Sequence, residues 1–106
     1  MDLVLQAHVH DYERTWPVAK GKAVALNYSD APAPVYIVNG AAGNREANAR
    51  PSGDEPWQPP AGPPGKQPYS SEVSIGVMTV TTGGIKWEQL RSSNGTVIDT
   101  FEMTKK

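Results

Sequence analysis

The sequence predicts a mainly β domain with little helix, in which short strands are joined by turns and by one long irregular segment. The 106-residue chain contains ten glycines and ten prolines, and both residue types interrupt helices. Its last third contains three runs rich in β-branched and aromatic residues, separated by Gly83-Gly84 and by Asn94-Gly95. These runs, at 74–82, 85–90 and 96–103, predict three consecutive antiparallel strands, a meander.

The composition limits both the size and the partners of the protein. A length of 106 residues allows one domain or part of one. The net charge of −1 and the pI near 6.1 give no reason to expect a nucleic acid or an anionic membrane as a partner. The absence of cysteine excludes disulfides and thiolate metal sites. No apolar run has the length of a signal sequence or a membrane-spanning helix.

The first element is a short apolar run, Leu3-Val4-Leu5, of the kind found in buried strands. It is followed by His8 and His10, the two histidines of the chain. If the strand continues through Val9, both imidazoles lie on one face, with Cα atoms roughly 6.5 Å apart. They could then each bind one of two metal ions spaced roughly 3.5–4 Å apart, or converge on a single ion. The alternative is that both are surface or core residues without a metal.

The middle of the chain predicts a hairpin, a strand and two loops. Lys20-Gly21-Lys22 indicates a β-hairpin within 19–30, and a strand is expected at 35–38. The glycine-containing stretch 39–44 is typical of a strand-terminating turn or of an anion-binding nest. Seven of the ten prolines lie in 49–68, which predicts a Pro-rich loop. Its Pro-Trp-Gln-Pro stretch could bind an SH3 or WW domain, or could form a surface loop with Trp57 against the body.

Within the meander, alternation assigns side chains to opposite faces. In the first strand, Ile75 and Val77 face one side, and Met78 and Val80 face the other. We expect the aromatic and methionine side chains of the meander to belong to the core.

The string His8-Val9-His10-Asp11-Tyr12-Glu13-Arg14 resembles the last metal-binding motif of purple acid phosphatases, in the calcineurin-like metallophosphoesterase superfamily. That motif is written Gly-His-x-His-x-Tyr-Glu-Arg, and Ala7 stands here at the glycine position. The stretch 31–46 and the order of strands and turns in the meander resemble the same family. The resemblance implies that 1–106 is a single partial domain, the C-terminal part of a metallophosphoesterase α/β sandwich.

The resemblance also implies a function. The family hydrolyses phosphomonoesters at a dinuclear metal centre of iron with zinc, manganese or a second iron. His8 corresponds to a ligand of the divalent ion, and His10 to a ligand of the trivalent ion. A structural role is the favoured interpretation for Tyr12, Glu13 and Arg14. The candidates for orienting the ligands or bordering the pocket are Asp11, Tyr12, Glu13 and Asn44.

The family's other metal ligands come from upstream motifs, which this sequence does not contain. We therefore expect a missing N-terminal part as partner, a phosphate ester as substrate, and weak metal binding without turnover for the isolated chain. A separately encoded N-terminal half could complete the sheet. The alternative function is a noncatalytic β-module that binds a protein through its Pro-rich loop or a sheet edge. Self-association through an exposed sheet edge, for instance around Leu3-Val4-Leu5, is a further expectation.

Two sequons, Asn27-Tyr28-Ser29 and Asn94-Gly95-Thr96, are candidate glycosylation sites. Purple acid phosphatases are typically secreted, vacuolar or lysosomal glycoproteins, which agrees with this interpretation. The chain itself shows no signal peptide, so its own location stays open.

Overall fold

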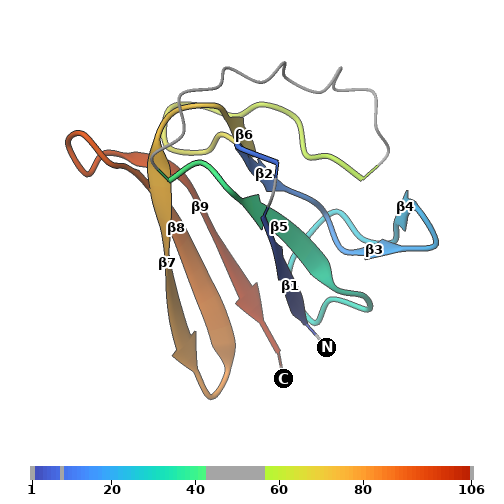
Figure 1. Ribbon diagram of the computed structural model, residues 1–106. Coiled ribbons are helices and arrows are strands. Elements are labelled where there is room, and N and C mark those ends of the chain that lie inside the picture. Colours follow the sequence, from blue (N-terminus) through green and yellow to red (C-terminus); the bar gives the residue numbers. More distant parts are fainter. Residues whose placement is uncertain (1, 8, 43–56, 106) are drawn as a thin grey trace.

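Two β-sheets face each other in the computed structural model, which describes residues 2–7, 9–42 and 57–105 (Figure 1). The four-stranded sheet has the strand order β1 (Leu3–Gln6), β5 (Val35–Asn39), β2 (Tyr12–Arg14) and β6 (Tyr69–Ser70). The three-stranded sheet consists of β7 (Ser74–Thr81), β8 (Gly84–Arg91) and β9 (Val97–Thr104). Within the described residues the structure contains no helix, which confirms the predicted fold class.

The four-stranded sheet contains one parallel pair, a detail that the sequence pattern does not specify. β1 runs parallel to β5, with Leu3 opposite Val35 and Gln6 opposite Val38. β2 is antiparallel to both β5 and β6. Because β1 and β5 are parallel, their carboxyl ends lie at the same edge of the sheet. This edge is where α/β sheets commonly place their ligands.

A small hairpin leaves the end of β2, as predicted. It pairs β3 (Val18–Ala19) with β4 (Lys22–Ala23). Its two turn residues, Lys20 and Gly21, have φ angles of 52° and 74°. Two consecutive positive φ angles are typical of the tight turn whose twist matches the two strands that it joins.

The predicted meander is confirmed. β7 pairs with β8 along its whole length, and β8 pairs with β9, both antiparallel. A register shift between Gln89 and Leu90 interrupts the second ladder. The turn that leads into β9 contains Gly95 with a φ of 71°, as expected for Asn-Gly.

The core lies between the two sheets and is small. It is built from side chains at alternate positions of the strands that face each other. The first sheet contributes Tyr12, Val35 and Ile37, and the second contributes Trp87, Phe101 and Met103. Leu3, Tyr28, Ala31 and Ile85 pack around this cluster.

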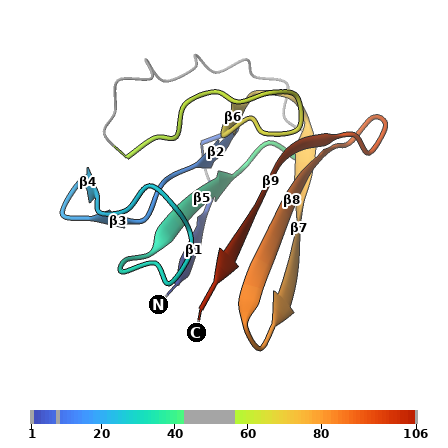
Figure 2. The same ribbon diagram turned by 180° about the vertical axis from the view of Figure 1, so that it is seen from behind.

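One prediction of burial is wrong. Met78 is 44% exposed instead of belonging to the core, because the core cluster takes its side chains in this sheet from β8 and β9 and none from β7. Leu5 is 53% exposed on β1, an outer strand of the other sheet, which differs from the burial typical of such an apolar run but agrees with the expected exposed edge around Leu3-Val4-Leu5. Figure 2, which shows the molecule from behind, places β7 on the side of β8 away from β9 and β1.

The described part of the Pro-rich segment, 57–68, contains no strand. Its start is held against the body, since the backbone N–H of Trp16 donates to the carbonyl of Trp57 at 2.8 Å. The indole of Trp57 remains 38% exposed. Residues 49–56, and Pro56 of the predicted SH3 or WW ligand with them, lie outside the described residues. In the described ranges we find no helix that is long and apolar enough to cross a membrane.

Candidate metal site

The histidine pair lies in the connection from β1 to β2, at the carboxyl end of β1. The strand ends at Gln6, so the condition for a shared strand face, that the strand continues through Val9, is not met. The backbone N–H of Asp11 donates to the carbonyl of Val9 at 3.0 Å, which turns the chain back toward β2. His10 is half-buried in this connection, and His8 lies outside the described residues. His10 is therefore placed at the sheet edge by a turn and not by a position on the strand.

The connection that follows β5 lies directly against the histidine connection. The N–H of Gly40 donates to the carbonyl of Asp11 at 3.0 Å, and Ala41 is buried. Its 39–42 part is thus a strand-terminating turn, in which the Gly40 amide binds the protein's own backbone instead of an anion. Asn44, the predicted pocket-border residue, lies outside the described residues.

Asp11 is the buried carboxylate of this site. The residue is only 3% exposed, and its Oδ1 has no hydrogen-bond partner among the described residues. Burial raises the pKa of Asp11, and a hydrogen bond with Glu13 opposes the rise. A carboxylate oxygen that is buried and left without a donor is costly unless a cation or a further donor reaches it.

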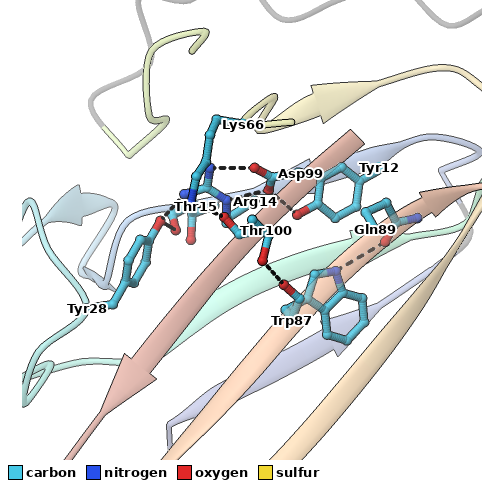
Figure 3. Close-up of polar contacts among 9 residues, drawn as sticks. All are labelled: Tyr12, Arg14, Thr15, Tyr28, Lys66, Trp87, Gln89, Asp99 and Thr100. Carbon is cyan, nitrogen blue, oxygen red and sulfur yellow. Dashed lines mark hydrogen bonds and ion pairs between the residues drawn. The ribbon is translucent and has the colours of Figure 1, made fainter. Parts of the chain in front are cut away.

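Tyr12 and Arg14 point into the space between the sheets, where both bind Asp99 of β9 (Figure 3). The Tyr12 hydroxyl donates to Asp99 Oδ2 at 2.5 Å. Arg14 Nε donates to the same oxygen at 2.7 Å, and Arg14 Nη2 donates to Oδ1 at 3.0 Å. This two-bond geometry is the strong form of an arginine–carboxylate pair. The contacts support the structural interpretation of Tyr12 and Arg14.

Asp99 is a residue that the sequence reasoning missed. The available signal was an acidic residue inside an apolar strand, Val97-Ile98-Asp99, since a charged residue is rarely buried without a partner. Asp99 is fully buried, and Arg14 is 7% exposed. The pair joins β2 to β9 across the interior and thereby holds the strand that follows the histidine connection.

Tyr28 completes this polar cluster. Its hydroxyl accepts from Arg14 Nη1 at 2.6 Å and donates to the carbonyl of Thr15 at 2.9 Å. Its ring lies 4.9 Å from the ring of Phe101, centroid to centroid. Burial raises the pKa of Tyr28 to about 12, with Arg14 opposing the rise. The pKa of Tyr12 is raised by burial and by Asp99, so both phenols stay protonated well into the alkaline range.

A second buried network ties the sheet of β7–β9 to the end of β5. Gln89 is fully buried and accepts from Trp87 Nε1 at 3.2 Å. Its own amide donates to Asn39 Oδ1 at 3.0 Å and to Ser74 Oγ at 2.9 Å. Asn39, the residue immediately before Gly40, is therefore bound both by Tyr12 in its own sheet and by Gln89 of the facing sheet.

The residues present fit only part of a metal site. Among the described residues, no group of three His, Asp or Glu side chains gathers at one place. An imidazole from His10 and the unpartnered buried oxygen of Asp11 are suitable donors on neighbouring residues. A complete coordination sphere needs ligands from His8 or from polypeptide beyond 1–106.

The two sequons lie at the surface. Asn27 and Asn94 are both exposed. Their side-chain oxygens accept hydrogen bonds from the backbone of Ser29 and Thr96, each at 3.0 Å. Both asparagines are accessible in the chain as described.

The fold and the site together define a two-sheet β-domain with a histidine connection at the carboxyl edge of a parallel strand pair. The chain belongs to the family described as iron/zinc purple acid phosphatase-like protein C, whose model matches residues 33–100, more than half of its length. Its structure is similar to that of the purple acid phosphatase PPD1 from seeds of yellow lupin (Lupinus luteus), with a TM-score of 0.82 and 23% sequence identity. The match covers 99% of this chain and 18% of the lupin chain. No curated protein matches the chain by sequence.

The residues that these matches cover determine which conclusions they establish. The family match contains β5 and Asp99 but begins after the histidine connection. The structural match extends over nearly the whole chain, which spans less than a fifth of the lupin protein's length. The family membership is thus shown, while the roles of His8 and His10 remain predictions.

Proposed function

We propose that this chain is the C-terminal portion of a purple acid phosphatase-like enzyme, and that it supplies His8 and His10 to a dinuclear metal centre that hydrolyses phosphomonoesters. The observation that carries the proposal is the position of the histidine connection at the carboxyl ends of β1 and β5. This is the edge at which ligands bind in such sheets. Family membership supports the same reaction class.

In the proposed reaction the residues of this chain hold the metal ions and orient the metal ligands, and none of them transfers a proton. His10, with His8, binds metal through a neutral imidazole nitrogen. In this proposal Asp11 and Glu13 orient these ligands. Tyr12 and Arg14 hold the strand that follows through their bonds to Asp99. When bound, a centre of iron with zinc, manganese or a second iron supplies charge for the phosphate ester and lowers the pKa of a coordinated water.

The remaining ligands must come from polypeptide outside 1–106. In this proposal the missing N-terminal part of the catalytic domain is the partner, either in one longer chain or as a separately encoded half. The isolated chain binds metal weakly and lacks turnover. Secretion or a vacuolar or lysosomal location, with glycans at Asn27 and Asn94, belongs to the same proposal.

A second candidate is a noncatalytic β-module that binds a protein partner through a sheet edge. It is favoured by β7, an outer strand whose Ile75, Val77, Met78 and Val80 are 40–63% exposed. Long uncharged edge strands are sites of strand addition.

A chimera tests the metal role. Residues 1–106 replace the matching segment of the lupin enzyme, and hydrolysis of p-nitrophenyl phosphate is measured with iron, zinc and manganese. We expect turnover in the chimera, a loss of about 100-fold or more in His10→Ala, and no change in the exposed control Lys86→Ala. A folded chimera whose metal content and activity are unaffected by His10→Ala contradicts the proposal. The same assay on residues 1–106 alone should show no turnover.

A further inference from the structure

We infer that Gly40 is a positioning residue for the metal-binding connection: the absence of a side chain at this position sets the path of the backbone at Val9 and His10. The inference rests on the proposed metal role of His8 and His10 and adds a residue to it. Gly40 lies in the other connection at the same sheet edge, about thirty residues away in sequence.

The contact between the two connections is made by backbone atoms. A Cβ placed on Gly40 would overlap the carbonyl oxygen of Val9, the residue between the two histidines. It would also lie 3.1 Å from the Val9 carbonyl carbon and 3.5 Å from the Cα of His10. No side-chain rotation relieves such an overlap, because every atom that it meets belongs to the backbone.

The reason for a glycine at position 40 is the lack of room for a Cβ atom, and not an unusual φ angle. Gly21, Gly65 and Gly95 have φ angles between 71° and 88°, in the left-handed region that favours glycine. Gly40 is outside this group, so an alanine can adopt its backbone angles. The Gly40→Ala substitution therefore tests the contact with Val9 and little else.

The two sides of the contact differ in their freedom to move. The Gly40 side is held by the ladder between Asn39 and Tyr12, by the bond from Gln89 to Asn39, and by the N–H of Ser74, which donates to Ala41 at 3.4 Å. The other side is a surface connection in which Val9 is 47% exposed. An added methyl group therefore displaces the Val9 carbonyl, and with it the acceptor of the Asp11 N–H. A shift of about 1 Å in a supporting group is enough to reduce the performance of a metal or catalytic site about 100-fold.

The matched control is Gly83→Ala. Gly83 lies in the turn between β7 and β8, has no positive φ, and has no atom within 4 Å of an added Cβ. Both substitutions add one methyl group, but only the methyl group of Gly40→Ala contacts the histidine connection.

Two measurements test the inference. Amide ¹H–¹⁵N spectra of the 106-residue chain report the backbone of Val9, His10 and Asp11, and a zinc titration followed in the same spectra reports metal affinity. In Gly40→Ala we expect displaced signals at these three residues and zinc binding weakened by about 10-fold or more, with the urea midpoint close to that of Gly83→Ala. A purely structural role would lower the urea midpoint and leave the zinc affinity of the folded protein unchanged.

The outcomes separate this inference from the proposed function. If His10→Ala weakens zinc binding and Gly40→Ala behaves like Gly83→Ala, the positioning role is wrong and the ligand role stands. If zinc binding is indifferent to His10→Ala, the ligand role fails, and the spectra still show whether Gly40 sets the path of the connection. Unchanged signals at Val9, His10 and Asp11 in Gly40→Ala overturn the inference directly.

Discussion

β7 and β9 flank β8 in one sheet and have the same length, yet they lie in opposite environments. β9 contains two acidic residues, Asp99 and Glu102, and half of its residues are buried. β7 contains no charged residue, and most of it is exposed. The more polar strand is the interior one, because it faces β2 and has a partner there for its buried carboxylate. Position in the sandwich, and not the apolarity of the strand, decides burial in this sheet.

The largest expected effect is at Asp99 of β9. In Asp99→Ala, the buried guanidinium of Arg14 loses its counter-charge and Tyr12 loses its acceptor, so we expect the free energy of unfolding to fall by about 3–5 kcal/mol. Urea denaturation followed by tryptophan fluorescence measures this loss. Asp99→Asn keeps the shape and an acceptor and should lose less. A loss under about 1 kcal/mol in the alanine variant would mean that the bonds from Tyr12 and Arg14 to Asp99 do not hold β2 to β9.

An alanine substitution in β9 and another in β7 test whether the side chains of β9 contribute more to stability than those of β7. Phe101 of β9 is 6% exposed and Ile75 of β7 is 48% exposed. We expect Phe101→Ala to cost about 3–4 kcal/mol, because it opens a cavity beside Tyr28. Ile75→Ala should change stability by about 0.5 kcal/mol or less. Equal losses in the two variants, measured by urea denaturation, would mean that β7 is covered in solution.

Alkaline pH probes the cluster next to β9. The pKa of Tyr28 is about 12 in the folded state, above its ordinary value of 10.0. The unfolded chain therefore ionises first, so the stability contributed by the neutral phenol is complete below pH 10 and is lost as the pH rises toward 12. Over this range we expect a loss of roughly 1–3 kcal/mol from this group. Tyr28→Phe should show a shallower decline between pH 10 and 12, and identical slopes would refute the assignment.

The smallest expected effect on stability is at the exposed end of β7. Val80 is 63% exposed, so Val80→Lys should leave the unfolding free energy within about 0.5 kcal/mol. If the chain self-associates through this edge, the added charge should shift it toward monomer, since lysines on edge strands oppose pairing. Light scattering over a range of concentrations measures the shift. Ser93→Lys adds the same charge in an exposed turn and should leave association unchanged.

Much of the fold could be read from the sequence, while the arrangement at the candidate site could not. The meander follows from alternating β-branched residues and two glycine turns, which are local signals, and β5 follows from an apolar run after prolines. The path of the chain through Val9 and His10 could not be derived from the sequence, because nothing local indicates that β1 ends at Gln6. The contact that shapes this path comes from Gly40, which is distant in sequence.

The sequence by itself determined the fold class, the three-stranded meander and the family resemblance at the histidine motif. Only the tertiary structure decided which strands are covered, that β1 and β5 are parallel, and that Asp99 pairs with Tyr12 and Arg14. The physical reason is that turns and strand propensity act over a few neighbouring residues. Burial and ion pairing depend instead on which sheet surface lies opposite, and residues almost ninety positions apart meet there.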